Sequence, residues 1–274
     1  MKFEQCAQNY LSELETGSNP ARPKTLAAYR STIRVHLLPR FGRMELAEIA
    51  RQNNRLLRDM VRDLRTEYKP ASIRFIVTLA KQVLESAKDA NGLPAYPMRW
   101  APDYIDLPVI ADQKQPTITA DELRNVIQDG PDAVLYTFLA ASGLRISEAL
   151  ALVKEDVSDG MVHIRHGKTA NAARYVDLAP PIAEMIQRVA GETKPGGRLF
   201  PTSLTPLRER IRVPGFHSLR RFRESVLLRS ECRKILISSW MGHADPDMAS
   251  RYGKQLLSDA AFRKEWAERV GTGW

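Results

Sequence analysis

Apolar residues recur at helical spacing along the first 90 residues of the chain. This periodicity predicts helices over residues 1–15, 24–38, 44–49, 54–64 and 71–90. Gly17 to Pro20 breaks the first helix, and Pro39 is expected to stop the second. The polar faces of the second and last helices carry five cations of interest: Lys24, Arg30, Arg34, Arg74 and Lys81.

The pattern changes in the second half of the chain, where short alternating stretches interrupt the helices. Thr119 and Glu122 fit a capping box at the start of a helix, and residues 132–141 form an apolar, buried one. Alternation predicts two strands, Met161–Arg165 and Arg174–Leu178, joined by a turn. Further helices are expected over residues 146–152, 182–189, 215–228 and 235–240, and from about Pro246. The expected fold class is therefore mainly α with a small antiparallel sheet.

Five prolines fall between residues 93 and 117 and divide the chain. Because such a density of proline disrupts regular structure, we interpret this stretch as a linker. It separates a helical domain, residues 1–92, from a second domain, residues 118–254. The tail, residues 255–274, has an apolar stripe that fits either a last core helix or a helix that docks on a neighbouring protomer.

The charge balance points to a polyanionic partner. The 274 residues carry a net charge of +9 and the pI is about 9.7, which favours nucleic acid, although a basic protein without such a partner has the same balance. Cys6 and Cys232 are far apart and outside any C-x-x-C pattern, as in a protein of the reducing cytoplasm. No stretch of about 18 apolar residues predicts a membrane span.

Candidate chemistry is concentrated between Phe216 and Tyr252. His217 and Arg220 are three residues apart and share one face of a helix near its start. His243 follows Gly242, a residue type that commonly ends a helix, and Tyr252 comes nine residues later. Each of these residues alone is more often structural, but together they suit anion binding with nucleophilic attack.

Two upstream stretches complete a pattern. Arg145 lies in AASGLRISEALAL and Lys168 in HIRHGKTANAARYVDL. The ordered set Arg145, Lys168, His217-x-x-Arg220, Gly-His243 and Tyr252 resembles the tyrosine recombinase (phage integrase) family. The resemblance covers about residues 1–260 and is sharpest from Ser142 to Tyr252. It implies that the helical domain clamps one face of double-stranded DNA. Many phage integrases carry a further N-terminal domain for distant arm sites, and none is expected here because the helical domain begins at the first residues.

The resemblance also implies a role for each site residue. Arg145 and Arg220 would bind the phosphate, with Glu148 holding the Arg145 guanidinium. Tyr252 would attack, His217 would accept its proton, and His243 would donate a hydrogen bond to the phosphate. Lys168, at the tip of the turn between the strands, would protonate the leaving oxygen. The reaction would need no metal or other cofactor.

Two other functions share parts of this pattern. A type IB topoisomerase-like enzyme nicks and rejoins DNA with the same chemistry, and a DNA-binding regulator could keep the fold without catalysis. The family resemblance favours a recombinase that assembles into a tetramer on DNA, with the tail docked on a neighbour.

Overall fold

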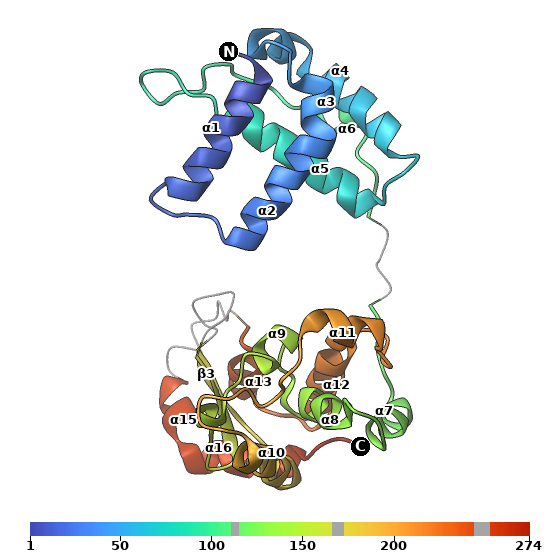
Figure 1. Ribbon diagram of the computed structural model, residues 1–274, viewed down its shortest axis with the longest axis vertical. Helices are drawn as coiled ribbons and strands as arrows, with labels where there is room; N and C mark the ends of the chain where they lie inside the picture. Colours follow the sequence, from blue (N-terminus) through green and yellow to red (C-terminus); the bar gives the residue numbers. More distant parts are fainter. Residues whose placement is uncertain (111–114, 166–172, 244–252) are drawn as a thin grey trace. The chain divides into compact units, whose positions relative to one another are not determined.

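The computed structural model describes residues 1–110, 115–165, 173–243 and 253–274. The chain forms two compact units, Met1–Gln113 and Lys114–Trp274, which run from blue to green and from green to red in Figure 1. Among the described residues, no helix combines the length and apolar character needed to cross a membrane.

Helices build the first unit. They are α1 (Phe3–Thr16), α2 (Pro23–Thr32), the π-helix η1 (Ile33–Leu37), α3 (Leu38–Phe41), α4 (Leu46–Leu64), α5 (Pro70–Glu85) and α6 (Pro102–Ile105). Their apolar faces enclose one core, in which Phe3, Leu46 and Val83 are completely buried. The helical periodicity of the sequence therefore gives the correct class of structure here.

Two predicted boundaries in this unit are wrong. Pro39 does not stop the second helix, because it lies in the first turn of α3, where a missing N–H group costs little. The wider turn of η1, where the N–H of Leu38 bonds to the carbonyl of Ile33, leads into that position. The helices predicted over 44–49 and 54–64 are one helix, α4, which is kinked at Gln52 (φ −134°, ψ 23°).

Part of the predicted linker belongs to the first unit. Ile105 of α6 is completely buried in its core. The side chain of Asn54 donates to the Arg99 carbonyl at 2.9 Å and accepts from the N–H of Ala101 at 3.0 Å. The prolines disrupt regular structure as expected, but apolar anchors between them hold this stretch on the helices. The division between the two units falls between residues 113 and 114 of the sequence.

The second unit combines helices with a small sheet. Its helices are α7 (Ala120–Ile127), α8 (Ala133–Ser142), α9 (Ile146–Ala149), η2 (Lys154–Asp156), α10 (Pro180–Glu192), α11 (Leu204–Glu209), α12 (Phe216–Arg229), α13 (Lys234–Met241), α15 (Lys254–Ser258) and α16 (Ala260–Val270). The strands β1 (Val157–Ser158), β2 (Met161–Ile164) and β3 (Arg174–Asp177) form an antiparallel sheet in the order β1-β2-β3. The predicted fold class and capping box of α7 are confirmed, whereas the two-residue strand β1 was too short to predict.

The tail packs on its own unit. Trp266, Ala267 and Val270 of α16 are buried in the core of the second unit. Arg263 of α16 donates to the buried carboxylate of Asp177 in β3 at 3.0 Å. In this single chain the apolar stripe of the tail therefore faces its own unit, and docking on a neighbouring protomer stays a prediction.

Candidate functional site

The candidate residues of the second unit gather where three helix ends meet. Arg145 caps the start of α9 just after α8 ends, His217 and Arg220 lie in the first turns of α12, and His243 follows the end of α13. Helices α8 and α12 pack against each other, and α13 packs on β3 (Figure 1). Residues that are 98 positions apart in the sequence thus come from neighbouring elements.

Glu148 holds Arg145 as predicted. Its carboxylate accepts from Arg145 Nη1 at 2.8 Å and from the Arg145 backbone N–H at 3.0 Å. The Arg145 side chain is 35% exposed, whereas that of Glu148 is only 4% exposed. The ion pair fixes one edge of the guanidinium and leaves solvent-accessible surface on the arginine.

Arg220 connects two of the helix ends. It is buried, and its Nη1 donates to the carbonyl of Gly143 at 2.8 Å while Nη2 donates to the carbonyl of Met241. These carbonyls lie at the ends of α8 and α13, where helices have unpaired acceptors. Burial, and then the positive charge of Arg145, lower the pKa of Arg220 to about 10. Arg220 therefore remains a cation at neutral pH.

Arg174 is a site residue that the sequence reasoning missed. It begins β3 and is buried, with Nη2 2.9 Å from Glu148 Oε2 and Nε 2.9 Å from the Trp240 carbonyl oxygen. The strand pattern pointed to it, because Arg174 and Val176 are two residues apart in a strand and therefore face the same side of the sheet, where Val176 is buried. An arginine on the inward face of a strand requires a partner of opposite charge.

Both histidines are exposed, yet their surroundings favour the neutral form. Partial desolvation lowers the pKa of His217, and the cations Arg221, Arg220 and Arg145 lower it further. Desolvation and then Arg220 lower the pKa of His243. A neutral imidazole can accept a proton at one nitrogen while the other donates a hydrogen bond.

The chemistry of this cluster is that of an anion site with a base beside it. Three guanidinium groups, Arg145, Arg174 and Arg220, surround the one carboxylate of Glu148. The cluster therefore carries an excess of positive charge, and the partly exposed Arg145 can offer N–H donors to an oxyanion such as phosphate. Among the described residues, no group of three or more His, Cys, Asp or Glu side chains could hold a metal ion.

Two predicted site residues, Lys168 and Tyr252, lie outside the described residues. The predicted short helix from about Pro246 and the turn between β2 and β3 lie outside them as well. Nothing in the described geometry therefore tests the roles assigned to this lysine and this tyrosine.

The five predicted DNA-contacting cations are in the first unit, and three already have partners there. Arg30 pairs with Glu15, Arg74 Nε donates to the Pro108 carbonyl at 2.8 Å, and Lys81 Nζ lies 4.8 Å from the centre of the Trp100 ring. Lys24 and Arg34 are exposed. A role in binding DNA stays a prediction for all five.

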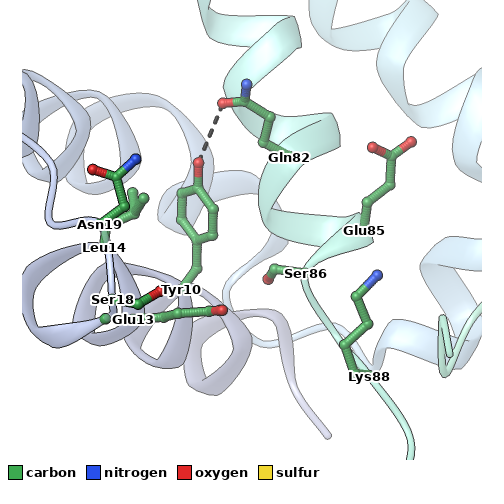
Figure 2. Close-up of a pocket in the computed structure, with 10 residues that line it drawn as sticks. Tyr10, Glu13, Leu14, Ser18, Asn19, Gln82, Glu85, Ser86 and Lys88 are labelled. Atoms are coloured by element: carbon green, nitrogen blue, oxygen red, sulfur yellow. Dashed lines mark hydrogen bonds between the residues drawn. The ribbon is translucent and has the colours of Figure 1, made fainter. Parts of the chain in front are cut away.

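The first unit also has a pocket of about 500 Å³. Figure 2 shows it between α1, the segment after α1 and the end of α5, with Tyr10 Oη donating to Gln82 Oε1 at 3.3 Å. Its charged lining residues are Glu13, Glu85 and Lys88. The pocket contains none of the predicted site residues and has no cluster of cations for an anionic ligand.

The first unit is similar to a known protein family. Residues 2–55 match the family model of the phage integrase N-terminal SAM-like domain. No curated protein sequence matches the chain significantly.

Solved structures match most of the chain at low sequence identity. The Tn1549 transposon integrase in complex with circular intermediate DNA has a TM-score of 0.66 and 15% identity, over 96% of this chain and 98% of that one. Lambda integrase bound to DNA has a TM-score of 0.67 and 15% identity, over 95% and 98% of the two chains. A lambda integrase tetramer bound to a Holliday junction has the same TM-score and identity, over 90% and 79%.

Proposed function

We propose that this chain, which has the fold of the tyrosine recombinases, is a site-specific DNA recombinase that works through a 3′-phosphotyrosyl intermediate. The observation that carries the proposal is the convergence of Arg145, His217, Arg220 and His243 at three helix ends of the second unit. Along the sequence these four residues stand in the order of the family motif.

The two arginines bind the scissile phosphate. A guanidinium offers N–H donors in a fixed fork that matches two phosphate oxygens, and Glu148 holds one of these forks in place. Because Arg220 is fixed by two backbone carbonyls, its charge needs no reorganisation when negative charge develops on the phosphoryl oxygens.

Tyr252 is the nucleophile in this proposal, and His217, Lys168 and His243 assist it. A free tyrosine side chain has a pKa of about 10, so Tyr252 must lose its proton to attack phosphorus. His217 accepts that proton, which its lowered pKa allows because the imidazole is neutral at pH 7. The bond from phosphorus to the 5′-oxygen breaks as the phosphotyrosyl bond forms. Lys168 protonates the 5′-oxygen, and His243 donates a hydrogen bond to the phosphate.

The first unit favours recombination over simple nicking and rejoining. Its residues 2–55 resemble a domain found in phage integrases. Strand exchange between two duplexes needs four active sites, so we propose that protomers bind double-stranded DNA and assemble there as a tetramer. A type IB topoisomerase-like activity remains the second candidate because the cleavage chemistry is the same.

The test is covalent capture on DNA. The full chain is incubated with a pool of nicked, random-sequence duplexes, and adducts that survive sodium dodecyl sulfate are isolated. We expect adducts with the wild-type protein, a phosphotyrosine linkage at residue 252 by mass spectrometry, and one enriched DNA sequence. Tyr252→Phe should bind that sequence equally well without forming an adduct. An adduct with Tyr252→Phe contradicts the assignment, and exchange between two plasmids that carry the enriched site separates a recombinase from a topoisomerase-like enzyme.

The role of Lys168 has its own test. Lys168→Ala should cleave the ordinary substrate slowly but recover when sulfur replaces the leaving 5′-oxygen, because a thiolate leaves without a proton. Equal impairment of Lys168→Ala on the oxygen and sulfur substrates would show that this lysine is not the general acid.

A further inference from the structure

Arg174 links two parts of the site that come from distant stretches of sequence. Its guanidinium donates to Glu148 of α9 with both Nη atoms, at 2.9 and 3.4 Å, and to the Trp240 carbonyl of α13 with Nε at 2.9 Å. Only 4% of the surface of either side chain in the Arg174–Glu148 pair is exposed. The contact therefore lies under the site rather than at its mouth.

The backbone at the end of α13 is fitted to this arginine. Gly242 adopts a left-handed conformation (φ 62°), and a Cβ there would lie 2.8 Å from Arg174 Cζ. The next residue is His243. Arg174 thus contacts the segment that presents His243 and also contacts the carboxylate that holds Arg145.

We propose that Arg174 is a positioning residue of the cleavage site, which holds Glu148 against Arg145 and fixes the end of α13 beside them. This inference rests on the proposed function. It assigns to Arg174 no contact with DNA, because the side chain is buried behind Glu148.

The charges around Glu148 explain why a second arginine is needed. Burial alone raises the pKa of this carboxyl, but hydrogen bonds from Arg174 and Arg145 outweigh burial and lower it. The charged groups that face Glu148 are Arg145 on its own element, Arg174 on β3 and Arg220 on α12. Without Arg174 the balance moves toward burial, so the pKa of Glu148 rises and the carboxyl takes up a proton at a higher pH.

The sign of the pH effect follows. Glu148 can accept from both the side chain and the backbone of Arg145 when it is ionised, and protonation removes part of that capacity. In Arg174→Met, cleavage should therefore be lost as pH falls through the raised pKa of Glu148. The rate relative to wild type should fall by about tenfold per pH unit below that pKa.

The experiment compares single-turnover adduct formation at saturating protein, on the nicked duplex recovered by covalent capture, between about pH 6 and about pH 9. The matched control is Arg210→Met, which also removes the partner of a buried carboxylate, here Asp132 at 2.6 and 2.8 Å, outside the cluster. Arg174→Lys keeps a charge beside Glu148 and should recover the wild-type pH dependence. Thermal unfolding of each variant identifies the temperature at which all are folded.

The outcomes separate the inference from the function on which it rests. If wild type and Arg210→Met cleave alike and Arg174→Met loses activity mainly at low pH, the positioning role is supported. If Arg174→Met is folded and loses no activity, or loses the same fraction at every pH, the inference is overturned while the proposed function stands. Absence of any adduct with the wild-type protein contradicts the proposed function itself.

Discussion

The guanidinium of Arg174 occupies the space that a side chain on Gly242 would need, with Cζ and Nη1 each 2.8 Å from the ideal Cβ position. The positive φ of Gly242 adds a second obstacle, because a left-handed conformation costs other residues about 1–2 kcal/mol. We therefore expect Gly242→Ala to lower the free energy of unfolding by at least about 1 kcal/mol and to slow adduct formation. Urea unfolding and single-turnover cleavage measure the two effects.

Gly191 provides a control for this prediction. It lies in α10, and a Cβ there would meet nothing within 4 Å. Gly191→Ala should stabilise the protein by up to about 1 kcal/mol, since alanine is the better helix former, and should leave cleavage unchanged. Equal effects of the two substitutions would show that the fit between Gly242 and Arg174 has no energetic consequence.

Arg145→Ala and Arg220→Ala should each reduce the rate of cleavage by about 10²–10³-fold, the usual cost of removing a fixed donor aimed at developing charge. The rate is measured as adduct formation at saturating protein, so that weaker DNA binding does not contribute. Arg229→Ala, at the exposed end of the same helix α12, is the control. A near wild-type rate in either site variant would make that arginine a structural residue only.

Arg220→Ala requires one additional check. Its removal leaves the carbonyls of Gly143 and Met241 without their present donor, which destabilises the protein by about 1–3 kcal/mol for a buried polar group. Cleavage is therefore compared at a temperature where thermal unfolding shows the variant to be folded.

Much of this site follows from local rules of sequence, and the exceptions follow from long-range contacts. Arg145, Arg220 and Gly242 could be placed because capping and helical periodicity depend on neighbouring residues. Arg174 was missed because its partner Glu148 is 26 residues away and no local pattern joins them. The predicted helix end at Pro39 was wrong because proline is compatible with the first turn of a helix as well as with the residues after its end.

The pH dependence of cleavage tests the role of His217. Desolvation and nearby cations lower the pKa of His217 below its usual range, so a base in its neutral form persists to lower pH than usual. Arg221→Ala removes the first of these cations and should raise the pKa of His217. The acid limb of the rate profile then moves to higher pH, while Arg229→Ala leaves it in place. A limb that does not move in Arg221→Ala would indicate that His217 is not the group that titrates.

The contacts of the tail lead to a prediction about its docking, because periodicity alone could not tell whether its apolar stripe faces its own unit or a neighbour. In the structure Arg263 pairs with Asp177, whose Oδ2 also accepts from Trp240 Nε1 at 2.9 Å. Breaking a buried pair by removing one partner costs about 3–5 kcal/mol. Arg263→Ala should therefore lower the unfolding temperature markedly, whereas Lys264→Ala, on the exposed face of α16, should not.

Protein concentration then distinguishes docking within the chain from docking between chains. A helix that packs on its own unit gives an unfolding temperature that does not depend on protein concentration, whereas docking on a neighbour makes it rise with concentration. We expect the unfolding temperature of the free protein to stay constant over about a hundredfold range of protein concentration. Deletion of residues 255–274 should destabilise the second unit by at least about 3 kcal/mol, because the burial of Trp266 and Val270 is lost. A concentration-dependent unfolding temperature that the deletion abolishes would instead assign the tail to a neighbouring protomer.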